Sequence, residues 1–126
     1  MILLLDTSVL IDHLRGDERA AGRLLTAAEQ GHEIWSVAVV RTEIYAGAFP
    51  SEEADIRELF ARLRWIDVTP DLADAAGRLG ANYRRSHPGI DAIDFIVGAA
   101  ALEVGAKLMT MNVKHFPMFP GLRPAY

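Results

Sequence analysis

The sequence contains no cysteine among its 126 residues. This absence excludes a disulfide framework and any metal site that is built on thiolate ligands. A bound metal would therefore have to be held by oxygen ligands or by one of the four histidines. A chain without disulfides is also compatible with a reducing compartment.

Long apolar runs are absent as well. The apolar segment Ile2–Leu5 is too short for a signal peptide and follows no basic segment. The uncharged run 95–102 is bounded by Asp94 and Glu103, and it is far shorter than a membrane span. We therefore expect a soluble protein that resides in the cytoplasm and has no contact with a membrane.

An excess of positive charge is the third feature that is missing. The net charge of −4 argues against a protein that coats nucleic acid through bulk electrostatics, although it does not exclude a nucleic-acid enzyme. The hydrophobic fraction of 51% is high enough for a packed core, and disorder is not expected. Length and composition predict one domain over residues 1–126.

Short apolar segments alternate with longer segments of helical periodicity along the chain. The predicted strands cover residues 2–5, 34–36, 65–68 and 107–110. The predicted helices cover residues 9–14, 17–30, 39–48, 51–64, 70–86 and 91–104, with Ser51 as a cap and Gly16, Gly31 and Gly105 as stops. This order predicts an α/β fold with a parallel sheet covered by helices on both faces. A further edge strand is expected near Leu122, which gives four or five strands.

Four polar residues fall where the carboxyl ends of parallel strands would place a ligand site. Asp6 and Asn112 follow the first and last predicted strands, and Glu43 lies in the second turn of the helix after the second strand. Asp94 begins an apolar helix whose interior position would make an unpaired charge very costly. Since this topology sends all four to one rim of the sheet, we expect a shared acidic site. Oxygen ligands without cysteine suit Mg²⁺ or Mn²⁺.

Each of these residues also has a purely structural interpretation. Asp6 and Asp91 are good helix N-caps, and we favour that role for Asp91. Glu43 alone would most often be a solvated glutamate, and Asn112 a turn residue. Thr7 and Ser8 have two open roles, either capping the first helix or orienting a ligand of the site.

Three segments together resemble the PIN-domain ribonucleases, and most closely the VapC-type toxins of bacterial toxin–antitoxin pairs. They are LLLDTSVLIDHLRGD, VVRTEIYAGA and IDFIVGAAALEVGAKLMTMNVKHF, which stand in the same order and spacing as in that family. The resemblance covers essentially the whole chain. It implies a three-layer α/β/α fold with a central parallel sheet, and a single PIN domain over residues 1–126.

The resemblance implies that Asp6, Glu43 and Asp94 hold Mg²⁺ or Mn²⁺ and that Asn112 completes the catalytic group. Asp94 rather than Asp91 matches the family's third acid, and Thr110 and Asn112 match its T-x-N/D segment. Many relatives have a fourth acid at the position of Asn112 or His115. One firm metal site is therefore expected, with a second left to depend on the substrate.

The implied activity is metal-dependent hydrolysis of phosphodiester bonds in RNA, with tRNA as a possible target suggested by the family. The implied partners are a VapB-type antitoxin that inhibits the enzyme and a second copy of the chain. Apolar faces at residues 11–14 and 44–49 could serve either contact or belong to the core. Basic residues near helix ends are candidates for RNA backbone contacts: Arg15, Arg84, Arg85, Lys114 and His115. The alternative function is a PIN-like module that binds RNA or protein without cleaving it.

Overall fold

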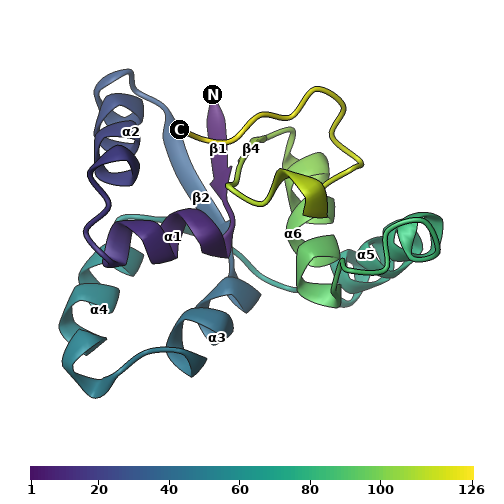
Figure 1. Cartoon of the computed structure of the whole chain (residues 1–126), viewed down its shortest axis with the longest axis horizontal. Helices are drawn as coiled ribbons and strands as arrows, with labels where there is room; N and C mark the ends of the chain where they lie inside the picture. The colour runs from purple at the N-terminus through teal and green to yellow at the C-terminus, as the bar shows by residue number, and fades with distance from the viewer.

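The computed structural model describes residues 1–126 as three layers, with a parallel sheet between two layers of helices (Figure 1). The sheet has four strands in the order β3-β2-β1-β4. Their bounds are Ile2–Leu5 for β1, Glu33–Val37 for β2, Arg64–Ile66 for β3 and Lys107–Met109 for β4. All three strand pairings are parallel, so the predicted α/β/α class is confirmed.

The central strand β1 explains why the chain opens on an apolar run without alternation. Leu4 pairs with Trp35 of β2 on one side and with Leu108 of β4 on the other. Leu3, Leu4 and Leu5 are at most 1% exposed, because helices cover both faces of the sheet. A strand that is buried on both faces needs apolar residues at every position.

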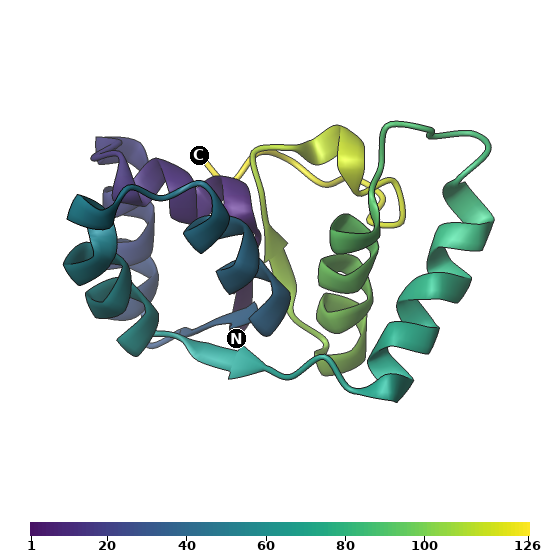
Figure 2. The same cartoon turned by 90° about the horizontal axis from the view of Figure 1, so that it is seen from below.

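Six helices cover the sheet. Their bounds are Thr7–Leu14 for α1, Glu18–Glu29 for α2, Ala38–Ala46 for α3, Glu53–Ala61 for α4, Pro70–Tyr83 for α5 and Ala92–Val104 for α6. Figure 2 shows α1, α2 and α4 on one side of the strands and α6 on the other, with α5 outside α6. None of these helices combines the length and apolarity that crossing a membrane would require.

Four of the six helices begin at a residue whose side chain caps the helix. The side chains of Asp6, Asp17, Thr69 and Asp91 accept hydrogen bonds from the first backbone N–H groups of α1, α2, α5 and α6. Gly105 ends α6 with a φ of 65°, a left-handed conformation that side chains other than glycine disfavour. The N-cap role that we favoured for Asp91 is therefore present in the structure.

Two predictions of local structure are wrong. Residues near Leu122 form no strand, and only the Ala125 N–H bonds to the β4 side of the sheet, through the Thr110 carbonyl at 2.9 Å. Three prolines in the tail lack the N–H that a strand ladder needs. Ser51 does not cap α4, because Pro50–Glu52 forms a short 3₁₀ helix in which the Glu52 carboxylate accepts the Phe49 N–H.

Candidate active site

The fold brings the helix starts and strand ends together at one edge of the sheet. Helices α1 and α3 begin directly after β1 and β2, at the carboxyl ends of those strands. Helix α6 precedes β4 and returns across the sheet, so its first turn lies at the same edge. This arrangement places Asp6, Glu43, Asp94 and Asn112 around one cleft of about 400 Å³.

Asp6 is almost completely buried, at 4% exposure, and both of its carboxylate oxygens are bonded. Its Oδ1 accepts the Ser8 N–H at 3.0 Å and the Ser8 hydroxyl at 2.6 Å. Its Oδ2 accepts the Thr110 hydroxyl at 2.6 Å. Burial raises the pKa of Asp6, while the hydrogen bonds from Ser8 and Thr110 oppose that rise. Asp6 therefore caps α1 with one oxygen and faces the end of β4 with the other.

Ser8 and Thr110 join the ends of the two neighbouring strands. The Ser8 hydroxyl accepts the Met111 N–H at 3.0 Å, and the Thr110 hydroxyl accepts the Asn112 N–H at 2.9 Å. The two open roles of Ser8 are thus resolved in part, because Asp6 itself caps α1 and Ser8 orients the Asp6 carboxylate. These bonds hold the backbone before Asn112 in place.

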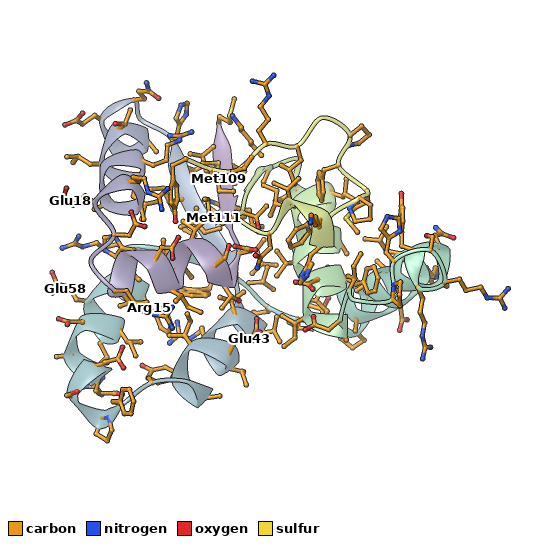
Figure 3. All side chains as sticks on the ribbon, viewed as in Figure 1. Arg15, Glu18, Glu43, Glu58, Met109 and Met111 are labelled. Atoms are coloured by element: carbon orange, nitrogen blue, oxygen red, sulfur yellow. The ribbon has the colours of Figure 1, made fainter.

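Glu43 projects from the second turn of α3, and its Oε1 accepts the Thr7 hydroxyl at 2.6 Å. Thr7 therefore orients a second acid of the cleft instead of capping its own helix. Figure 3 shows the labelled side chains of Glu43 and Arg15 in the space between α1 and α3, where both residues line the cleft.

Asp94 lies in the first turn of α6 in a reciprocal capping arrangement with Asp91. Its Oδ2 lies 3.0 Å from the His115 Nδ1 and accepts the Asp91 N–H at 3.3 Å. Burial, followed by the negative charge of Asp91, raises the pKa of Asp94 to about 6. The His115 imidazole therefore lies within ion-pairing distance of the Asp94 carboxylate.

The predicted basic residues are distributed unevenly. Arg15 and His115 line the acidic cleft. Arg84 instead lines an apolar groove of about 520 Å³ between α5 and α6. Arg85 and Lys114 are exposed and line neither cavity.

Asp12 also lines the cleft and was not among the predicted site residues. Ser8 lay outside the predicted helix 9–14, whereas α1 begins at Thr7 and therefore includes both Ser8 and Asp12, four residues apart. Residues at that spacing share a helix face.

The donor set of the cleft fits a hard divalent cation that keeps part of its water shell. The carboxylates of Asp6, Glu43 and Asp94 and the amide of Asn112 supply oxygen, the ligand type that Mg²⁺ and Mn²⁺ prefer. Burial raises the pKa of both Asp6 and Asp94, because it disfavours the charged carboxylate. No three His, Asp or Glu side chains lie close enough together to hold an ion directly.

The PIN domain family matches residues 3–117 of this sequence, and the chain therefore belongs to that family. The resemblance predicted from the three sequence segments is confirmed.

Among named relatives, the chain is similar to Ribonuclease VapC19 of Mycobacterium tuberculosis. The two are 46% identical over 123 residues, which cover 98% of each chain. Ribonuclease VapC10 of the same organism is 37% identical over 125 residues, covering 99% of this chain and 93% of that protein.

Solved structures show the same fold at lower sequence identity. A VapBC2 complex from Rickettsia felis bound to a promoter DNA fragment matches with a TM-score of 0.82 and 21% identity, covering 97% of this chain and 96% of that one. A toxin–antitoxin complex from Klebsiella pneumoniae matches with a TM-score of 0.78 and 24% identity, covering 98% of both chains.

Proposed function

We propose that this protein is a metal-dependent endoribonuclease and the toxin of a type II toxin–antitoxin pair. One observation carries the proposal: Asp6, Glu43, Asp94 and Asn112 open into a single cleft of a chain that is similar over its whole length to a VapC ribonuclease. The reaction is hydrolysis of an RNA phosphodiester bond.

Asp6, Glu43 and Asp94 are the residues that would hold Mg²⁺ or Mn²⁺, partly through water molecules. A bound ion would activate a water molecule and stabilise the negative charge that develops at the phosphate. The neighbouring residues keep the acids in position. Thr110 and Ser8 fix Asp6, and the Thr7 hydroxyl fixes Glu43.

The side chains of Asn112 and His115 lie at the same cleft and complete its polar lining. The amide of Asn112 can donate a hydrogen bond to a phosphate oxygen, and it can donate to or accept from a water molecule. The imidazole of His115 is close enough to Asp94 to hold that carboxylate in one orientation.

Cleavage of total cellular RNA by the purified protein tests this proposal. We expect cleavage with Mg²⁺ or Mn²⁺, its loss in EDTA, and its loss in Asp6→Asn and Glu43→Gln. Asp67→Asn is a matched control, because Asp67 is exposed at the end of β3 and lies outside the cleft. Cleavage that persists in EDTA would contradict the metal mechanism.

The same experiment separates the proposal from a PIN-like module that binds RNA without cutting it. Such a module would retain RNA and leave it intact under every metal condition. Mapping the ends of the cleaved RNA would also test tRNA as the substrate, which the family resemblance suggests.

A third cavity supports a VapB-type antitoxin as the partner. A groove of about 310 Å³ lies between α1, α3 and α4, and it shares Glu43, Arg15 and Ile11 with the acidic cleft. Phe49 at this groove is 73% exposed, whereas Ile44 is 5% exposed and belongs to the core. A peptide with apolar side chains could fill the groove and place an Arg or Lys against the acids.

Phe49→Asp should weaken co-purification with a VapB-type antitoxin that is co-expressed with this protein. Leu25→Asp is the matched control, because Leu25 is 61% exposed on α2 and lies outside the groove. Equal capture by both variants would place the antitoxin elsewhere.

A homodimer is the remaining part of the proposal. The apolar groove between α5 and α6 supports it, because exposed small residues such as Ala73 and Ala81 permit close approach of a second chain. Light scattering of the purified protein measures this state directly.

A further inference from the structure

Helix α1 presents one polar face along the acidic cleft. Ser8, Asp12 and Arg15 all line the cleft, and their spacing of four and three residues keeps them on one side of the helix. At about 1.5 Å per residue, this face leads from the acids at the start of α1 to Arg15 roughly two turns away. Arg15 is therefore the cation that this helix offers to the cleft.

Arg15 is exposed and takes part in none of the ion pairs of the structure. This lack of a partner is informative, because Asp12 lies three residues earlier on the same face. A carboxylate and a guanidinium at that spacing commonly pair on a helix. Asp12 and Arg15 are nevertheless not paired in this structure.

The partner that Asp12 has instead is Tyr126. The Tyr126 hydroxyl donates to the Asp12 Oδ2 at 2.5 Å, across 114 positions of sequence. The Arg19 guanidinium lies 5.4 Å from the centre of the Tyr126 ring and pairs with Asp17 at 2.9 Å. The Ala125 N–H bonds to the Thr110 carbonyl at 2.9 Å, which fixes the backbone beside Tyr126.

The protonation state of Tyr126 agrees with this contact. Burial of the phenol, together with the hydrogen bond to Asp12, raises the pKa of Tyr126. The phenol therefore remains protonated and continues to donate to Asp12 at any physiological pH.

We propose that Arg15 binds a phosphate of the RNA strand beside the scissile bond, and that Tyr126 keeps Arg15 available by holding the Asp12 carboxylate. The inference rests on the proposed ribonuclease function and adds a substrate-binding residue with its positioning residues. Without the phenol hydroxyl, Asp12 is free to pair with Arg15 and to compete with the RNA for its charge.

Fluorescence anisotropy with a short labelled single-stranded RNA of random sequence tests this inference. The parent is Asp94→Asn with Mg²⁺ present, a background chosen to prevent cleavage during the titration. We expect Arg15→Gln and Tyr126→Phe each to weaken binding by about fivefold, as for one exposed charge pair. Each should also lower the slope of log K against log salt by about 0.7, the value for one phosphate contact on a single strand.

Double variants separate this mechanism from a general loss of structure. The effect of Tyr126→Phe should vanish in the Arg15→Gln background and also in the Asp12→Asn background, because the competing pair no longer exists. Tyr83→Phe is the matched control, since the Tyr83 hydroxyl forms no hydrogen bond and should leave RNA binding unchanged.

The possible results distinguish the two proposals. If Tyr126→Phe binds RNA like the parent, or if its effect persists in the Asp12→Asn background, the inference is overturned. Absence of RNA binding by the parent would overturn it too. Cleavage of RNA by the wild-type protein reports separately on the ribonuclease function, which can hold in either case.

Discussion

Replacing Thr110 by valine should destabilise the fold through a single lost hydroxyl. Thr110 is fully buried, and its hydroxyl donates to the Asp6 Oδ2 at 2.6 Å. Valine has nearly the same shape but can neither donate to Asp6 nor accept the Asn112 N–H. The buried carboxylate of Asp6 would then keep only the hydrogen bonds from its own helix.

The expected size of the effect follows from the chemistry of this contact. A hydrogen bond to a charged group contributes about 1.5–3 kcal/mol, and burial of an additional methyl group returns up to about 0.8 kcal/mol. The net loss in the free energy of unfolding is therefore about 1–2 kcal/mol. For a chain of this length, that corresponds to a decrease in Tm of roughly 4–8 °C.

Thermal unfolding followed by circular dichroism in EDTA measures the change, and pH supplies a second signature. The Thr110 hydrogen bond lowers the pKa of Asp6 because it stabilises the charged form. In the variant, that pKa rises further, so the folded state binds its proton more tightly. The penalty should therefore be largest at neutral pH and should shrink as falling pH protonates Asp6.

Thr110→Ser is the control, because it keeps the hydroxyl and removes only a methyl group. That change should cost about 1 kcal/mol at any pH. If the penalty of Thr110→Val is as independent of pH as that of Thr110→Ser, the assigned role of the hydroxyl is wrong.

Four further substitutions probe other parts of the fold. The pKa of Asp94, raised from 3.8 to about 6, means that the metal-free wild type loses stability as pH rises through that window. In EDTA at neutral pH, the free energy of unfolding of Asp94→Asn should therefore exceed that of wild type by about 1 kcal/mol after allowance for solvent, and its Tm should be higher. The variant should be stabilised less than wild type by added Mn²⁺. In Gly80→Ala the new Cβ would lie 3.0 Å from a ring carbon of Phe95, and urea unfolding should show a loss of about 1–2 kcal/mol. Gly77→Ala on the same helix meets no atom within 4 Å and should gain about 0.5–1 kcal/mol; a loss there would contradict the packing argument. Ser36→Ala removes a buried 2.7 Å hydrogen bond to the carbonyl at the end of β1, and a cost of about 1 kcal/mol is expected in the same assay.

The sheet could be predicted from the sequence because its strands leave a strong local signal. Four short apolar segments separated by helical periodicity permit few arrangements other than a covered parallel sheet. The absence of an edge strand near Leu122 could not be predicted from local periodicity, because a strand there would have to pair with backbone groups that are distant in the sequence. Ser51 failed as a cap because the preceding proline began a 3₁₀ turn one residue earlier.

The candidate site was predictable to the extent that topology alone determines it. Asp6, Glu43 and Asp94 follow from their positions at strand ends and helix starts. The contacts that orient these acids were not predictable, since Thr7 meets Glu43 and Thr110 meets Asp6 across 36 and 104 positions of sequence. The same limit hid the contact between Asp12 and Tyr126.

The two bonded oxygens of Asp6 have a practical consequence for anyone who needs an inactive form of this protein. Asp6→Ala would remove a helix cap and a cross-strand acceptor together, so a silent variant made there could be silent merely because it is unfolded. Glu43→Gln is the cleaner choice, because Glu43 accepts only one hydrogen bond, from Thr7, and carries no cap. Loss of toxicity in that variant would report on chemistry alone.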